Sequence, residues 1–293
     1  MHSQGNPEYI PADGTRRLFA QVLPARQDSG TLVVFESGGA STRSIWAPVQ
    51  AQTAAFARAV VYDRAGLGHS DPDPHGRTLA RMAADLNRLL DYFAAPRCIL
   101  VGHSAGGAIV RLAAAERPER IAGLVLADPA DEADDTLFPP PSAAPSASAS
   151  PPTTCLPMPA CCRCSTAALP ADAAANLRRD GMTPAVFRTC AEQSRTFLDE
   201  LYAWRRNPPG TGAIPLTIVS GALPGSGISR KARARLNALH EQRARAAPHG
   251  RHLTAPHSGH YVPLDDTELL AAEIRRLAVG GQGSLKPPNL PRT

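Results

Sequence analysis

"CILVGHSAGG", residues 98–107, contains one serine, Ser104, with a glycine two positions before it and another two positions after it. The residues before Ser104 are apolar and partly β-branched, which predicts a short buried strand. The alanine-rich stretch after it predicts a helix that ends near Pro118. Ser104 is therefore expected on a sharp turn from a strand into a helix.

The two glycines, Gly102 and Gly106, have a steric explanation. Such a turn holds its central residue in a strained backbone conformation, and side chains two positions before and after would collide. The turn also presents the Ser104 hydroxyl where the N–H groups and positive dipole end of the following helix can stabilise an oxyanion. This setting is typical of a G-x-S-x-G nucleophile elbow, although a simple glycine-rich turn has the same five-residue pattern.

The length and composition allow one large α/β domain. The chain has 293 residues, of which 43% are hydrophobic, enough for a substantial core and an insertion. No run of 18 apolar residues occurs, so we expect no membrane span. The first residues lack the charged and apolar segments of a signal peptide, which favours a cytoplasmic protein.

The cysteines and the arginines do not predict a metal site or a nucleic-acid partner. Cys98 is expected in the core, and four cysteines in a proline-rich segment lack the spacing of a common zinc motif: Cys155, Cys161, Cys162 and Cys164. The net charge is +5, and the densest basic stretch spans 230–245. No aromatic residues interleave its arginines, so we interpret it as the wet face of a surface helix that buries Leu236 and Leu239.

Buried strands alternate with helical patterns along most of the chain. The expected strands are 16–24, 31–36, 58–62, 98–102, 120–131, 214–220 and 251–255. This alternation predicts a mostly parallel, doubly wound sheet with helices on both faces. Residues 1–131 would form the first part of the core, 132–212 a lid or cap insertion, 213–279 the second part, and 280–293 a flexible tail. Within the insertion, the proline- and serine-rich segment 138–165 is expected to be disordered.

Five ordered motifs resemble the α/β-hydrolase family. They are "ESGGAS" (36–41), "YDRAGLGHSDP" (62–72), "VGHSAGG" (101–107), "LVLADPAD" (124–131) and "SGHYVPLD" (258–265). The resemblance extends from about residue 15 to 279 and implies the α/β-hydrolase fold with a lid.

The resemblance also implies roles for individual residues. Ser104 matches the nucleophile and His260 the base that activates it. The backbone N–H of Ala105 matches one oxyanion donor, and Gly39 supplies the second, with Gly38 as the alternative. Three other histidines lie in or near these motifs: His257 is close to His260 in the chain, His103 is expected to be structural, and His69 is expected to be a loop residue.

The acid of the site departs from the common family pattern. The segment after strand 214–220, "GALPGSGISR", contains no Asp or Glu. Asp128, at the end of the preceding strand, could orient His260, or a water could replace the carboxylate in a two-residue site. Asp128 could instead be only a cap ahead of Pro129. Weaker candidates are Asp131, Glu132 and Asp63, the last of which is expected in a structural turn or ion pair.

The resemblance implies a serine hydrolase that acts on an ester or related acyl compound without a metal or organic cofactor. Another cofactor-free reaction on the same scaffold stays open, such as that of a lyase, acyltransferase or haloperoxidase-like enzyme, as does a non-catalytic binding module. A small-molecule acyl substrate is the expected partner. Four aromatic residues in the insertion suggest an apolar roof over the pocket or ordinary helix packing: Phe187, Phe197, Tyr202 and Trp204.

Overall fold

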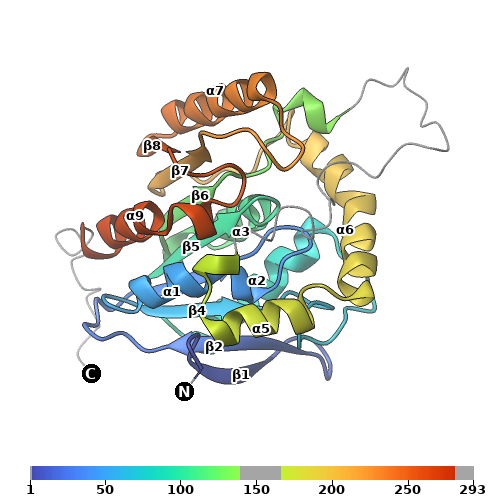
Figure 1. Cartoon of the computed structure of the whole chain (residues 1–293), viewed down its shortest axis with the longest axis vertical. Coiled ribbons are helices and arrows are strands. Elements are labelled where there is room, and N and C mark those ends of the chain that lie inside the picture. The colour runs from blue at the N-terminus through green and yellow to red at the C-terminus, as the bar shows by residue number, and fades with distance from the viewer. Residues whose placement is uncertain (1, 139–165, 281–293) are drawn as a thin grey trace, which may run out of the picture.

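One mixed sheet organises the chain in the computed structural model, which describes residues 2–138 and 166–280. Its eight strands are ordered β1-β2-β4-β3-β5-β6-β7-β8 (Figure 1). The strands are β1 (Asn6–Pro11), β2 (Arg17–Leu23), β3 (Leu32–Glu36), β4 (Arg58–Tyr62), β5 (Cys98–His103), β6 (Ile121–Ala127), β7 (Leu216–Gly221) and β8 (Gly250–Ala255). Strands β3 to β8 run parallel, and β1 and β2 form an antiparallel hairpin at one edge.

Helices cover both faces of this sheet, as the sequence predicts. They are α1 (Ala47–Thr53), α2 (Leu79–Phe93), α3 (Gly106–Glu116), α5 (Ala171–Asp180), α6 (Pro184–Ala203), α7 (Arg230–Ala246), α8 (Val262–Asp265) and α9 (Thr267–Gly280). Residues of α2, α3 and α7 pack into one hydrophobic cluster, whereas α1, α5 and α9 pack into a second. None of the helices in the described ranges has the length and apolar content needed to traverse a lipid bilayer.

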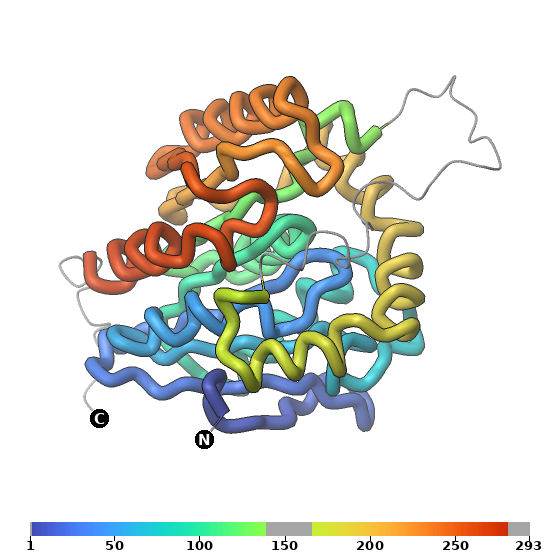
Figure 2. The backbone as a smooth tube through the Cα atoms, in the orientation of Figure 1, coloured from blue at the N-terminus to red at the C-terminus, as the bar shows by residue number. Residues whose placement is uncertain are grey.

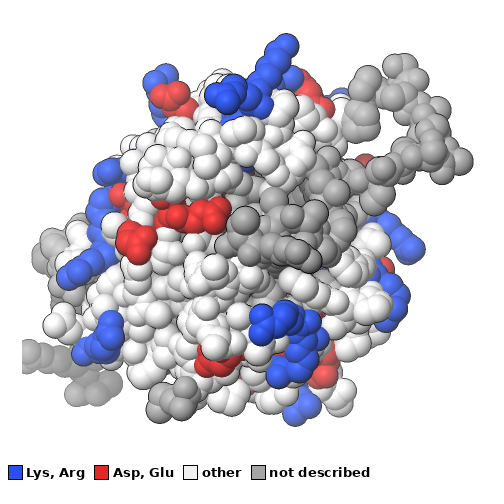
Figure 3. Space-filling model, in the orientation of Figure 1, with Lys and Arg blue, Asp and Glu red and all other residues white. Residues whose placement is uncertain are grey.

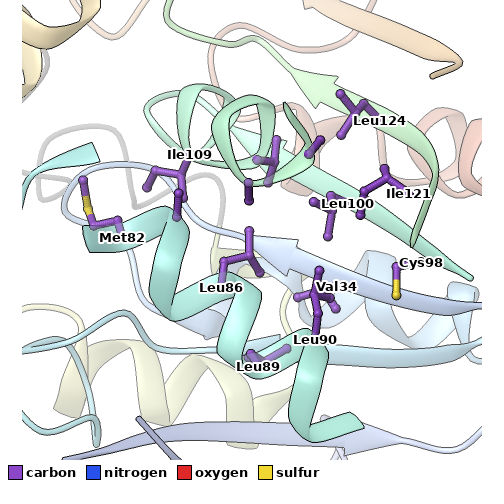
Figure 4. Close-up of a cluster of buried hydrophobic side chains, with 14 of the residues drawn as sticks. Val34, Met82, Leu86, Leu89, Leu90, Cys98, Leu100, Ile109, Ile121 and Leu124 are labelled. Carbon is purple, nitrogen blue, oxygen red and sulfur yellow. The ribbon is translucent and has the colours of Figure 1, made fainter. Parts of the chain in front are cut away.

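Helix α2 shows how an amphipathic pattern builds one of these clusters. Its apolar residues recur at helical spacing, and Met82, Leu86 and Leu90 are buried in the cluster that α2 forms with α3 and the sheet (Figure 4). The Thr78 side chain accepts a hydrogen bond from the Arg81 backbone N–H and caps the first turn. The core on this face therefore follows directly from the spacing seen in the sequence.

The strand order brings two loops together at one edge of the sheet. Strand β3 is followed by β4 on one side, and the chain then crosses to β5 on the other side. The carboxyl ends of β3 and β5 are adjacent, because Glu36 pairs in register with Gly102. In doubly wound sheets, ligands bind in the crevice outside such a switch in strand order. Ser104 and Gly39 follow these two strand ends.

The insertion contains two α-helices that the structure describes, α5 and α6, before the sheet resumes at β7. Figure 2 shows that the chain passes from α5 through α6 along one side of the molecule toward β7. The segment expected to be disordered, the four clustered cysteines and the expected tail lie outside the described residues, except for Phe138 and Gly280 at their edges.

The α2 cluster generates a test of stability. Leu86 is fully buried, so Leu86→Ala should lower the free energy of unfolding by about 2–5 kcal/mol through lost contacts and a cavity. The matched control is Leu223→Ala, because Leu223 is 45% exposed and should change that free energy by less than about 0.5 kcal/mol. Urea unfolding measures both, and equal midpoints would contradict the assigned core.

Candidate active site

Ser104 lies on the expected turn between β5 and α3. Its backbone φ is +53°, in the left-handed region that non-glycine residues rarely adopt. A Cβ on Gly102 would lie 2.7 Å from the Gly106 carbonyl oxygen, and one on Gly106 would lie 2.6 Å from the carbonyl oxygens of Glu36 and Ser37. Both glycines are therefore required by the close approach of β3, β5 and α3.

His260 and Asp128 are joined by a hydrogen bond, although 132 residues separate them. His260 Nδ1 lies 2.7 Å from Asp128 Oδ2. Asp128 directly follows β6 with φ +43°, and its side chain is fully buried. Since the carboxylate accepts, Nδ1 carries the proton and Nε2 of His260 is left to accept one.

The Asp128 carboxylate is ionised in spite of its burial. Burial raises the pKa of Asp128, but the hydrogen bond from His260 and the electrostatic interactions with His260 and Arg233 outweigh it and hold that pKa well below its ordinary value. The other oxygen, Oδ1, accepts from the Gly221 backbone N–H at 3.2 Å and from Arg233 Nη1 at 2.5 Å. The carboxylate is thus fixed by three donors from three segments.

His103, the residue before Ser104, brings the Ser104 turn and the His260 loop together. Its Nε2 donates to the His260 carbonyl oxygen at 2.9 Å, and the two rings lie 4.7 Å apart. Burial, with the neighbouring His260, lowers the pKa of His103 to about 3, so this ring is neutral. Among the described residues, no hydrogen bond joins the Ser104 hydroxyl to His260.

The loop after β3 is held by one buried arginine. Arg64 donates to the carbonyl oxygens of Ser37, Gly38 and Gly39 at 2.5–2.8 Å, and it pairs with Glu36. A peptide C=O and the next residue's N–H point in opposite directions in a trans peptide. Because the Gly38 carbonyl faces Arg64, the Gly39 N–H faces away from Arg64. A Cβ on Gly38 would lie 3.3 Å from the Ser104 Cβ, so this loop runs beside the serine.

The remaining sequence candidates have other partners. His257 pairs with Asp266 at 2.9 Å and is largely exposed, and His69 lies 3.1 Å from Asp180. Asp131 pairs with Arg243 at 2.6 Å. The other two acids also form ion pairs, Glu132 with Arg111 and Asp63 with Arg43 rather than with its neighbour Arg64.

Two buried arginines that contact the candidate site, Arg64 and Arg233, were not predicted from the sequence. The interpretation of the basic stretch as the wet face of a helix holds for the exposed Arg230, Lys231, Arg235 and Arg245 of α7, where Figure 3 shows basic groups at the top of the molecule. It is wrong for Arg233, which is buried beside Asp128. The available signal was spacing, since Arg233 precedes the buried Leu236 by one helical turn. For Arg64, no spacing pattern indicated contact with the loop after β3.

The aromatic residues of the insertion do not share one surface. Phe197 is buried in the hydrophobic cluster of α2 and α3, whereas Phe187 and Tyr202 are 37% and 49% exposed. Trp204 packs against the Arg111 guanidinium. Phe197 therefore serves helix packing, and the structure does not unite the four into a roof.

Comparison with known proteins identifies the family. The family model described as "Alpha/beta hydrolase family" matches residues 33–273. The chain is 38% identical over 99 residues to the "Putative carbamate hydrolase RutD" of Variovorax paradoxus. This alignment covers 33% of this chain and 37% of that protein. Eight curated relatives align over only 18–45% of their own lengths, so the chain spans less than half of each.

Solved structures share the fold over nearly the whole chain. A probable hydrolytic enzyme from Pseudomonas aeruginosa superposes with a TM-score of 0.69 at 17% identity and covers 93% of each chain. A thermophilic esterase from Thermogutta terrifontis gives a TM-score of 0.59 at 18% identity, covering 93% of this chain and 97% of the esterase.

The Asp131–Arg243 pair predicts a pH-dependent part of the stability. Burial raises the pKa of Asp131, but Arg243 lowers it more, to about 2, below the value of about 3.9 in an unfolded chain. The pair therefore stabilises the fold above about pH 4, and this stabilisation is lost as the pH falls from about 4 through about 2.

In urea unfolding, Asp131→Asn should lose about 2 kcal/mol relative to wild type at neutral pH, and the difference should shrink below about pH 4. Asp28→Asn, on an exposed turn, is the matched control and should show no such trend. A difference that stays constant with pH would contradict this assignment.

Proposed function

Because the chain belongs to the α/β-hydrolase family, we propose that it is a serine hydrolase that cleaves an ester or related acyl compound through an acyl-enzyme. The observation that carries the proposal is the hydrogen bond from His260 Nδ1 to the buried Asp128, beside a serine in a strained turn. Asp128 holds the imidazole in the tautomer whose Nε2 can take the Ser104 proton.

The reaction begins when an acyl substrate brings the Ser104 hydroxyl and His260 Nε2 within hydrogen-bond distance. As the oxygen of Ser104 attacks the acyl carbon, its proton passes to Nε2, and the imidazolium is stabilised by Asp128. His260 then gives this proton to the leaving group, which departs and leaves the acyl-enzyme. Water, activated by the same imidazole, releases the acid and restores the serine.

Two backbone N–H groups would stabilise the oxyanion. Those of Gly39 and Ala105 donate to no other backbone group of the described residues. The Ala105 N–H precedes the first turn of α3, whose positive dipole end favours the same charge. Preorganised donors of this kind usually contribute more to lowering the barrier of such reactions than any other single effect. Arg64 supports this role indirectly, because it fixes the loop that carries Gly39.

The nucleophile is tested with a fluorophosphonate probe. The probe should label the intact protein, and Ser104→Ala should abolish labelling because the reactive hydroxyl is gone. Ser29→Ala, on the loop before β3, is the matched control and should be labelled like wild type. Labelling that survives in Ser104→Ala would remove this residue from the mechanism.

The substrate class is defined by a panel of acyl esters of graded chain length, with a carbamate added.

The acid is tested with two matched substitutions. Asp128→Asn keeps the shape of the side chain but favours the wrong His260 tautomer, so turnover of a responsive ester should fall by a factor on the order of 10⁴, as in other Ser-His-Asp sites. Asp131→Asn should cost far less, because Asp131 pairs with Arg243. If the two substitutions exchange ranks, the acid is Asp131. If neither matters while Ser104→Ala and His260→Ala are inactive, the site works as a dyad.

A further inference from the structure

Arg233 binds the Asp128 carboxylate, which also accepts the hydrogen bond from His260. Its side chain is 2% exposed, and Nη1 donates to Asp128 Oδ1 while Oδ2 accepts from His260. The Nε and Nη2 atoms of Arg233 are buried and have no hydrogen-bond partner among the described residues. Within the same ranges, its charge is therefore paired with Asp128 alone.

Helix α7 fixes the position of Arg233. The Ser229 hydroxyl caps the helix by accepting from the Ala232 N–H at 3.2 Å. One turn after Arg233, the Asn237 side chain donates to the Gly221 carbonyl at 2.9 Å, and the Gly221 N–H donates to Asp128. The guanidinium thus approaches Asp128 beside Gly221, the last residue of β7.

The other titratable groups around Asp128 and His260 are neutral or paired. From β5, His103 is kept neutral by burial, with its pKa lowered to about 3. From α7, burial also lowers the pKa of His240, which bonds to Ser220 and to the Pro129 carbonyl. Tyr261 packs edge-on against the His260 ring. The nearby acids are Asp131, paired with Arg243, Asp265, close to the Ser258 hydroxyl, and Asp266, paired with His257.

We propose that Arg233 is a positioning residue of this site: it aims the Asp128 carboxylate at His260 and offsets its charge, so that His260 stays neutral, and able to take a proton, down to lower pH. The role in catalysis rests on the proposed serine-hydrolase function, whereas the effect on the imidazole does not.

The direction in which Arg233 shifts the protonation of His260 follows from simple electrostatics. A lone Asp128 carboxylate stabilises the His260 imidazolium and extends the protonated form to higher pH. A permanent cation on the far oxygen of the carboxylate opposes this effect. His260 must be neutral to accept the Ser104 proton, so the reaction rate falls at low pH as His260 becomes protonated. Arg233 moves this fall in rate to lower pH. Removing its charge should move that fall to higher pH.

The experiment is an NMR titration of the His260 ring in isotopically labelled protein, for wild type, Arg233→Gln, Arg233→Lys and Arg243→Gln. In Arg233→Gln, which keeps an N–H donor but loses the charge, the titration midpoint should rise by about half to one pH unit. Arg233→Lys keeps the charge and should stay close to wild type. Arg243→Gln, on the same helix but paired with Asp131, is the matched control and should not shift the midpoint.

The rate of fluorophosphonate labelling, measured against pH, should shift in the same direction and by a similar amount in Arg233→Gln. A folded Arg233→Gln protein with the wild-type midpoint would overturn the proposal, as would an equal shift in Arg243→Gln. If Arg233→Gln does not fold, the neutral pair Asp128→Asn with Arg233→Gln is compared with Asp128→Asn alone, and the same upward shift is required. If wild type is not labelled at any pH, the hydrolase function fails, while the ring titration still decides the effect of Arg233.

Discussion

The buried carboxylate of Asp128 is the constraint around which the second half of the molecule is arranged. An ionised carboxylate without partners inside a protein is very costly, so its lone pairs must be satisfied. Here the donors come from the end of β7, from α7 and from the loop that carries His260. Each of these segments is thereby located relative to β6. The geometry of the proposed site thus follows from the hydrogen bonds that the buried Asp128 carboxylate requires.

A second buried charge, that of Arg64, fixes the loop on the other side of the Ser104 turn. Arg64 donates hydrogen bonds to three successive carbonyl oxygens of the loop after β3. It forms an ion pair with Glu36, and Glu36 also accepts a hydrogen bond from the Tyr62 hydroxyl. Burial raises the pKa of Glu36, while the charge of Arg64 acts against that rise. Both sides of Ser104 therefore use an arginine–carboxylate pair to hold backbone or side chain in place. The serine turn, strained at φ +53°, lies between the two pairs.

The parallel sheet could be predicted because its strands are continuous apolar runs separated by helical patterns. The turn at Ser104 could be predicted because steric crowding requires glycine two positions before and after the serine. Strand β1 was missed because Pro7 and Pro11 argue against a strand, although the edge of a sheet tolerates proline. Helix α5 was missed because its alanine-rich sequence has a single large apolar residue, Leu177. Arg233 was misread because charge alone suggests exposure, and its partner lies 105 residues away in the chain. Long-range pairs of this kind leave no local pattern.

The separation between Asp128 and its donors has a consequence for biosynthesis. The ribosome completes β5, Ser104 and β6 well before α7 and His260 emerge, because Arg233 of α7 and His260 follow Asp128 by 105 and 132 residues. Until then the carboxylate has neither its cation nor its imidazole and must remain hydrated. The proposed site of Ser104, His260 and Asp128 can therefore be assembled only after the last third of the polypeptide has been synthesised and has packed.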